Sequence, residues 1–167
     1  MQCGRYYASH SDLRLELPVR QGQPPRTGRM VPYVQLDQWP PRNIAEELIE
    51  RSLRLPHVKS RESRMASQRT RALWLPDTFA VGPPEAFIDG HEFCHLHPPP
   101  EGGIHLTLPE GTRSLAVGMG WAEPHPVARL GAMPASLVMV YAPRNCEELA
   151  VALRLVQNSY DFARGPV

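Results

Sequence analysis

Proline is frequent along this chain and limits the secondary structure that it can form. The 167 residues include 19 prolines, roughly twice the number expected at an average usage of about 5%. Because proline lacks a backbone N–H and fixes φ, it interrupts both helices and sheet ladders. We therefore expect short strands, turns and few helices. A chain of this length with 42% hydrophobic residues fits one domain with a single core.

Two segments have the pattern of amphipathic helices. Residues 41–53 are bracketed by prolines and place Ile44, Leu48, Ile49 and Leu53 on one stripe. The second helix is predicted after Asn145, a favourable N-cap residue, with Glu148 three positions on and Gly165 just beyond the end. Both helices flank the central part of the chain.

Short candidate strands lie between these helices, each bounded by proline or glycine. They fall near residues 70–75, 85–88, 92–97, 103–108, 114–118 and 136–141. A helix, consecutive strands and a final helix are typical of an α+β domain, here a mainly antiparallel sheet flanked by an N-terminal and a C-terminal helix. Residues 1–40 form a proline-rich N-terminal arm with one candidate strand at 31–36, so we expect a single domain over 41–167.

Charge and cysteine content narrow the partners and the compartment. A net charge of +1 gives no field that favours nucleic acid or an anionic membrane. The N-terminus has no signal-peptide pattern, and the longest apolar run, residues 135–142, is too short to cross a bilayer. Three cysteines without a CxxC spacing argue against a disulfide framework. We expect a cytoplasmic protein without nucleic-acid or membrane partners; a homo-oligomer stays open.

Five of the seven histidines gather in one stretch of the sequence, and imidazole can ligate metals or transfer protons near neutral pH. Side chains alternate along a strand, so His95 and His97 share one face. A five-residue connection over residues 98–102 would place His105 opposite His95, whereas a six-residue connection would turn it to the other face. The sequence leaves both registers open. The five are His91, His95, His97, His105 and His125.

Several kinds of chemistry fit this cluster. Three histidines on one face, completed by Glu101 or Glu123, would suit Zn, Fe, Ni or Cu. Proton transfer or hydrogen bonding to a substrate is the alternative, and independent structural roles for each histidine are a third. The HxH-x₃-E spacing from His95 to Glu101 matches a first cupin metal motif, but Ser114 stands where the second motif has histidine, which argues against a cupin.

Two further groups follow the cluster. Glu123 and His125 alternate with prolines in a rigid stretch and could form a base with its orienting carboxylate. Tyr141 and Arg144 precede the last helix, where they could bind anionic or enolic oxygens, unless Arg144 instead pairs with Glu147 or Glu148. The sequence contains no serine elbow, phosphate loop or dinucleotide fingerprint.

In their order along the chain, the motifs HLHPPPEGGIHLTLP, GWAEPHP and YAPRNCEEL, with the closing helix, resemble the luciferase-like domain family. The resemblance covers about residues 85–160. Its fungal members oxidise a styryl-pyrone luciferin with molecular oxygen, without flavin or nicotinamide. The resemblance implies a pocket for a planar, oxygenated small molecule; light emission is not implied. The residues that would line this pocket are His95, His97, His105, Glu123, His125, Tyr141 and Arg144.

We therefore expect a small-molecule enzyme of specialised metabolism that acts on a polyketide-like or aromatic enol substrate. The reaction would be oxygenation, with O₂ as second substrate, or an acid/base rearrangement such as cyclisation. Two alternatives stay open. One is an oxygenase or isomerase that depends on a single divalent metal held by His95, His97 and His105, and the other is a non-catalytic small-molecule-binding domain.

Overall fold

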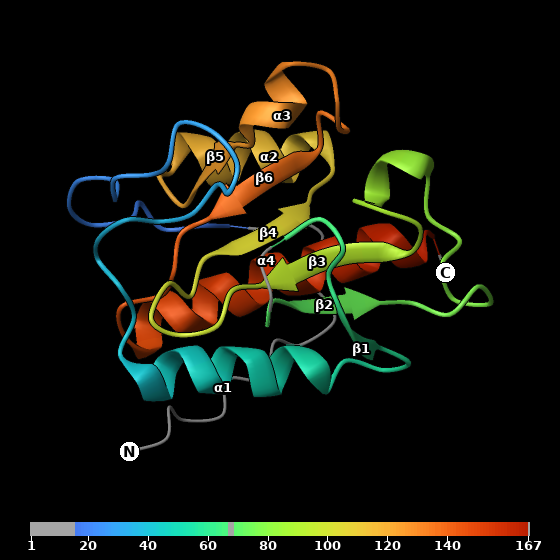
Figure 1. Cartoon of the computed structure of the whole chain (residues 1–167), viewed down its shortest axis with the longest axis horizontal. Coiled ribbons are helices and arrows are strands. Elements are labelled where there is room, and N and C mark those ends of the chain that lie inside the picture. The colour runs from blue at the N-terminus through green and yellow to red at the C-terminus, as the bar shows by residue number, and fades with distance from the viewer. Residues whose placement is uncertain (1–15, 67–68, 167) are drawn as a thin grey trace.

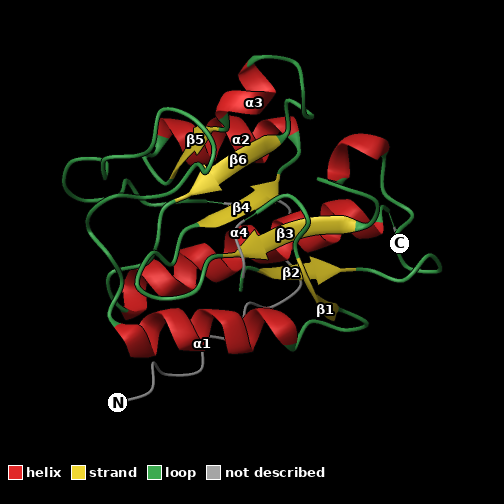
Figure 2. Cartoon of the chain, in the orientation of Figure 1, coloured by secondary structure: helices red, strands yellow, loops and turns green. Residues whose placement is uncertain are grey.

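The computed structural model describes residues 16–66 and 69–166, within which six strands form one antiparallel sheet of order β1-β2-β3-β4-β6-β5 (Figure 1). The strands are β1 (Lys59–Glu62), β2 (Arg71–Trp74), β3 (Glu92–Leu96), β4 (Ile104–Thr107), β5 (Ala122–Pro124) and β6 (Leu137–Val140). The helices are α1 (Arg42–Leu53), α2 (Glu110–Gly118), α3 (Pro126–Arg129) and α4 (Cys146–Arg164), with a 3₁₀ turn at Pro84–Ala86. The predicted α+β class with flanking helices is confirmed (Figure 2).

The two predicted helices form the covered side of the sheet. In Figure 1, α4 lies behind β3 and β4 with α1 beside it. The N-cap prediction is confirmed, because the Asn145 side chain accepts a hydrogen bond from the Glu148 N–H at 2.9 Å. Leu96, Ile104 and Leu106 are fully buried in this core, and burying an aliphatic side chain of this size contributes about 1.5–3 kcal/mol.

Three strand predictions were wrong, and each has a local cause. Residues 110–118 form α2 because Pro109 fixes an extended N-cap and Glu110 occupies the first turn. Residues 85–88 overlap the 3₁₀ turn, whose start is fixed by Pro84. Residues 31–36 contribute only one isolated bridge, between Thr27 and Gln35.

Three short elements were not predicted. Every residue of β1 is exposed and the strand reads KSRE, so it has no apolar alternation that could reveal a strand. β5 has three residues and ends at Pro124, and α3 has four. Elements of this length carry too few residues for a periodic signal.

The cysteine and membrane expectations have different outcomes. Cys94 is free and buried, whereas Cys146 is disulfide-bonded. That bond removes the cysteine count as an argument for a cytoplasmic protein. Within residues 16–66 and 69–166, no helix combines the length and apolarity needed to span a bilayer.

Candidate active site

One row of side chains crosses the sheet on the face opposite α4. Antiparallel pairing sets His95 opposite His105, His105 opposite Met139, and Met139 opposite Glu123. The His97 N–H donates to the Gly103 carbonyl at 2.9 Å, so the connection comprises the five residues 98–102. Of the two registers that the sequence left open, the structure therefore has the one that puts His95 and His105 on the same face.

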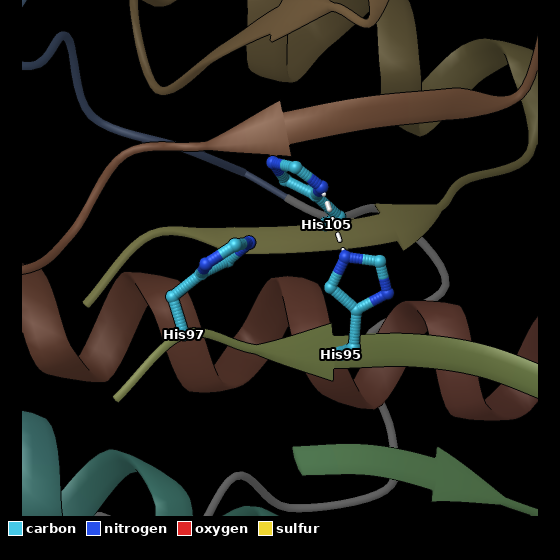
Figure 3. Close-up of side chains that lie close together, drawn as sticks. All are labelled: His95, His97 and His105. Atoms are coloured by element: carbon cyan, nitrogen blue, oxygen red, sulfur yellow. Dashed lines mark hydrogen bonds between the residues drawn. The ribbon is translucent and has the colours of Figure 1, made fainter. Parts of the chain in front are cut away.

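His95, His97 and His105 converge at this face (Figure 3). His95 Nε2 lies 2.9 Å from His105 Nδ1, and the ring centroids of His97 and His105 are 4.9 Å apart. One ring nitrogen from each of the three lies within 4.8 Å of the others. All three residues are at most 5% exposed, so most of the surface of each ring is shielded from water.

Two carboxylates fix which nitrogen carries the proton on His95 and His97. Glu92 Oε1 lies 2.6 Å from His95 Nδ1, and Glu101 Oε2 lies 3.1 Å from His97 Nδ1. An ionised carboxylate only accepts hydrogen bonds, so each Nδ1 must donate and each Nε2 keeps its lone pair in the neutral ring. Ser63 Oγ also donates to Glu92 Oε1, at 2.8 Å.

This assignment propagates to His105. In the neutral form of His95 the lone pair lies on Nε2, and the 2.9 Å contact then makes His105 Nδ1 the donor. His105 Nε2 then carries a lone pair as well. Among the described residues, His97 Nε2 and His105 Nε2 are buried and have no hydrogen-bond partner. In this assignment two acceptor nitrogens are left for a ligand, while the His105 ring also hydrogen-bonds the backbone of Tyr33.

In His125 the two ring nitrogens have the opposite hydrogen-bonding roles, with Nδ1 as acceptor and Nε2 as donor. Its Nδ1 accepts a hydrogen bond from the Val127 N–H at 3.3 Å, which caps α3. The neutral ring therefore carries its proton on Nε2 and donates there. The His125 ring stands edge-on to His105 with centroids 4.9 Å apart, so a donor nitrogen lies beside the acceptor nitrogens.

Burial keeps these imidazoles neutral. Burial first, and then the neighbouring His95, lowers the pKa of His97 and of His125 to about 4. Burial, reinforced by the surrounding histidines, also holds the pKa of His105 well below its ordinary value. At pH 7 all three rings are therefore neutral, the state in which imidazole ligates a metal or acts as a general base.

A cavity of about 350 Å³ lies over the cluster, a volume suited to a small molecule. Its floor is formed by His97, His105 and His125, and its rim includes Val31 and Met65, which are exposed and so open the cavity to solvent. The remaining lining residues come from the N-terminal segment and from the loop after β1: Pro32, Tyr33, Arg64 and Ala66.

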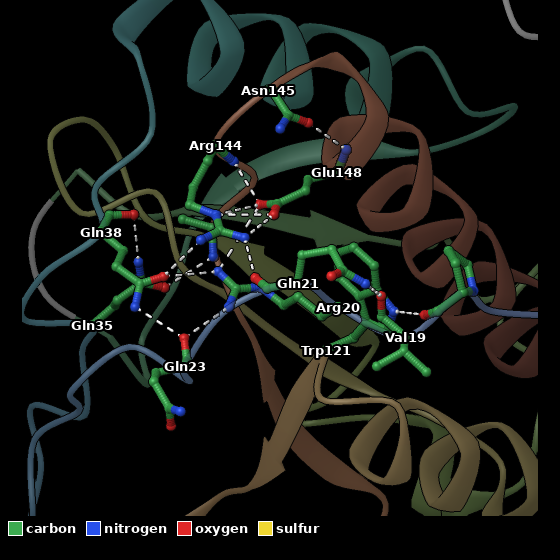
Figure 4. Close-up of polar contacts among 12 residues, drawn as sticks. Val19, Arg20, Gln21, Gln23, Gln35, Gln38, Trp121, Arg144, Asn145 and Glu148 are labelled. Atoms are coloured by element: carbon green, nitrogen blue, oxygen red, sulfur yellow. Dashed lines mark hydrogen bonds and ion pairs between the residues drawn. The ribbon is translucent and has the colours of Figure 1, made fainter.

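The other predicted site residues divide into two groups. Glu123 stands in the row with the histidines, and Tyr141 packs beside Met139, with burial raising its pKa to about 12. Of the seven predicted pocket residues, the cavity is lined by three, His97, His105 and His125, and not by His95, Glu123, Tyr141 and Arg144. Arg144 pairs with Glu148, the alternative that the sequence left open, within a polar cluster that joins the N-terminal segment to α4 (Figure 4).

Three residues of the site were not predicted. Strict alternation places Glu92 on the face opposite His95, but β2 and β3 shift register, with Leu73 opposite Cys94 and Trp74 opposite Glu92. The extra residue turns Glu92 toward His95. Ser63 and Tyr33 reach the site from distant segments with no local signal for a role there.

Comparison with known proteins finds a match over the part of the chain that holds the histidine cluster. Residues 90–159, which contain the strands β3, β4, β5 and β6, match the luciferase domain family. Luciferases of Armillaria ostoyae, Armillaria gallica and Armillaria mellea are each 26% identical to the chain over 164 residues, covering 88% of it. The chain spans 61% of the length of these relatives. No solved structure matches it. The resemblance found in the motifs is confirmed: the chain is similar to these luciferases, and its residues 90–159 match the luciferase domain family.

Proposed function

We propose that this domain is an enzyme that converts an enolic small molecule, polyketide-like or aromatic, by oxygenation or by acid/base rearrangement. One observation carries the proposal: His97 and His105 line the cavity, each ring is neutral, and each Nε2 is buried without a hydrogen-bond partner among the described residues. A neutral imidazole with an open lone pair is a general base for an enol hydroxyl. No flavin or nicotinamide is required for this step.

The base is backed by a chain of hydrogen bonds. When His105 Nε2 takes a proton, the positive charge can be shared with His95 through the 2.9 Å contact and stabilised by Glu92 beyond it. Glu92 is 1% exposed, so this stabilisation acts in a poorly screened environment. The arrangement resembles a base held in place by an orienting carboxylate.

The donor side completes the reaction. His125 Nε2–H can stabilise the oxygen on which the enolate charge develops. In the oxygenation, the enolate carbon gives two electrons to O₂ and forms a C–O bond, and the proton held by the base returns to the distal oxygen. Substrate plus O₂ thus gives a hydroperoxide with no external reductant. Without O₂, the same base and donor support a rearrangement.

The comparisons support the small-molecule class of this proposal. The relatives are named luciferases, and this chain shares with them the region that holds the cluster. Because the chain spans 61% of their length, we carry over only the enolic substrate class and O₂ as expectations. We do not propose light emission.

A second candidate is a metal-dependent oxygenase or isomerase. The observation that favours it is the convergence of His95, His97 and His105, with carboxylates behind two of them, since carboxylate–histidine pairs are typical of metal sites. A divalent ion would act as Lewis acid toward a substrate oxygen. The first candidate ranks higher because His95 Nε2 already bonds His105, so only two of the three nitrogens are free.

Oxygen uptake with a panel of hydroxypyrones and related enols tests the proposal. Tag-free protein, its metal content measured by mass spectrometry, is compared with the variants His105→Gln and His97→Gln. His91→Gln is the matched control, because His91 belongs to the same histidine-rich stretch but is partly exposed and contacts Asp77 outside the cavity. We expect uptake by wild type and the control and at least a 100-fold loss in the cavity variants.

The other outcomes are distinct. Near-stoichiometric metal that disappears in the cavity variants would establish the second candidate. Tight binding of a panel compound without uptake or product formation would show a non-catalytic binding domain and overturn both enzyme proposals. Equal uptake in all variants would show that the histidine cluster is not the site.

A further inference from the structure

We propose that Tyr33, supplied by the N-terminal segment, is a positioning residue of this site that orients His125 and Glu123. Its kinetic consequence rests on the proposed function, whereas the orientation of His125 can be measured without any substrate. Tyr33 lies outside the region 90–159 that matches the luciferase domain family. The matched region alone would therefore lack this wall of the cavity.

Arg20, which precedes Tyr33 in the N-terminal segment, anchors this segment to the rest of the domain (Figure 4). The Arg20 N–H donates to the Met119 carbonyl at 2.9 Å. Its buried guanidinium donates to Gln38 Oε1 at 3.1 Å and lies 3.9 Å from Glu148. A buried charge with these partners resists displacement, because moving the segment would leave the carboxylate and guanidinium unpaired.

Gln35 fastens the segment on the other side. Its Oε1 accepts a hydrogen bond from the Ala142 N–H at 3.0 Å, just after β6. Its Nε2 donates to the carbonyls of Asp37 and Gln38. Gln35 is 1% exposed, and its bond to Ala142 is buried. Two residues away, Tyr33 is consequently held at a fixed position over the sheet.

The ring of Tyr33 confines His125. Tyr33 is 5% exposed and packs on Met139 and Tyr141. It stands edge-on to His125, with centroids 4.8 Å apart and planes at 75°, a favourable aromatic geometry. His105 contacts His125 at 4.9 Å. With Nδ1 held by Val127 and the ring in contact with two others, His125 keeps its Nε2–H in one orientation.

The hydroxyl of Tyr33 hydrogen-bonds Glu123, the last residue of the row that begins with His95 and His105. Burial, and then a hydrogen bond to Glu123, raises the pKa of Tyr33, so the phenol stays protonated and donates to that carboxylate. Within the part of the chain that the structure describes, Glu123 Oε1 is buried without a hydrogen-bond partner. Tyr33 thus supplies a hydrogen bond that helps to hold this carboxylate beside the histidine row.

Three variants separate these roles. Tyr33→Leu removes ring and hydroxyl, and Tyr33→Phe removes the hydroxyl alone. Tyr160→Phe is the matched control, because Tyr160 is also a buried tyrosine with a bonded hydroxyl, to the Pro56 carbonyl, but packs on Phe93 in the helix-side core. Long-range ¹H–¹⁵N spectra of histidine-labelled protein, in a chelating buffer at pH 7, report the proton position on His125.

We expect wild type, Tyr33→Phe and Tyr160→Phe to show His125 as the Nε2–H tautomer. Tyr33→Leu should show averaged tautomers, because without the Tyr33 ring the imidazole can turn away from the Val127 N–H. With a compound that supports uptake, Tyr33→Leu should lose about 100-fold in kcat from misplacement of the donor, with KM changed less. Tyr33→Phe should lose about 10-fold, as expected for one hydrogen bond, and Tyr160→Phe should match wild type.

An unchanged His125 tautomer in a folded Tyr33→Leu protein would overturn the proposal, whatever its activity. If Tyr33→Leu does not fold, Tyr33→Phe decides: the ¹³C signal of the Glu123 carboxylate should shift in it and not in Tyr160→Phe, and an unshifted signal would overturn the proposal. If no panel compound is turned over, the proposed function fails while the spectra still decide the role of Tyr33.

Discussion

Replacing Glu92 tests the tautomer assignment on which the proposed chemistry depends. Glu92→Ala removes the acceptor of the 2.6 Å contact with His95 Nδ1 and of the 2.8 Å bond from Ser63. Both donors lie in a site where Glu92 is 1% and His95 2% exposed. An unsatisfied buried donor costs about 1–3 kcal/mol, so we expect a loss of about 4 kcal/mol in the free energy of unfolding.

Glu92→Gln makes the comparison specific. Its amide oxygen can still accept from both donors, so only the extra strength of a charged acceptor is lost, about 1–2 kcal/mol. For a chain of this size, 1 kcal/mol corresponds to about 2–4 °C in Tm. Glu92→Ala should therefore lower Tm by about 8–16 °C and Glu92→Gln by about 2–8 °C.

Urea unfolding followed by tryptophan fluorescence, in a chelating buffer, measures both variants. Glu110→Ala on α2 is the control, because its carboxylate is exposed and pairs with Arg113 at the surface, and its loss from the first turn of α2 should cost at most about 1 kcal/mol. A Glu92→Ala loss below about 1 kcal/mol, or equal losses for the two Glu92 variants, would refute the reasoning. Glu92 would then not fix the proton on His95, and the assignment of His105 would lose its basis.

Three further predictions concern the buried histidines, the packing of two glycines and the metal-dependent candidate. Since burial lowers the pKa of His97 and His125 from 6.5 to about 4 in the fold, the unfolded chain binds these protons first as pH falls. Urea unfolding in a chelating buffer should therefore show stability lost between pH 6.5 and 4, by at most roughly 3 kcal/mol per histidine; a flat profile would contradict burial of neutral rings. Gly82→Ala should lower the free energy of unfolding by about 3 kcal/mol, because a Cβ there would lie 2.2 Å from the Phe162 carbonyl oxygen. Gly111→Ala has no atom within 4 Å of its Cβ and should raise the free energy of unfolding by up to about 1 kcal/mol within α2. Thermal melts in which both variants shift Tm alike would contradict this packing. If the metal-dependent candidate holds, Glu101→Gln should weaken cobalt(II) binding about 10–100-fold in an absorption titration, and unchanged binding would place the metal away from His97.

Periodicity predicted the parts of the fold that bury one continuous face. α1 and α4 were found because their apolar stripes are long and their ends carry proline or an N-cap. α2 was mistaken for a strand because only Ala116 of its residues is buried, so the segment has no wide apolar stripe. β1 was missed because it is an exposed edge strand paired only with β2, and its position is set by that partner.

The site was predictable only where its residues are neighbours in sequence. The spacing of His95 and His97 and a five-residue turn to His105 follow from strand geometry, and the structure confirms that these three converge. Glu92 escaped because the register shift between β2 and β3 cannot be seen in one strand alone. Arg144 looked available as an anion-binding residue, yet Glu148, one helical turn on, is its partner.

Groups outside the histidine cluster determine which ring nitrogens donate hydrogen bonds and which accept them. Glu92 fixes the proton on His95, which fixes that on His105, while the backbone of Val127 fixes that on His125. Two adjacent imidazoles of the same type are thereby made different, one an acceptor and the other a donor. Four histidines bound only to each other would exchange these roles freely. Glu92 and the Val127 N–H therefore matter as much as the rings in deciding which histidine acts as base and which as hydrogen-bond donor. Counting histidines in the sequence would not reveal either group.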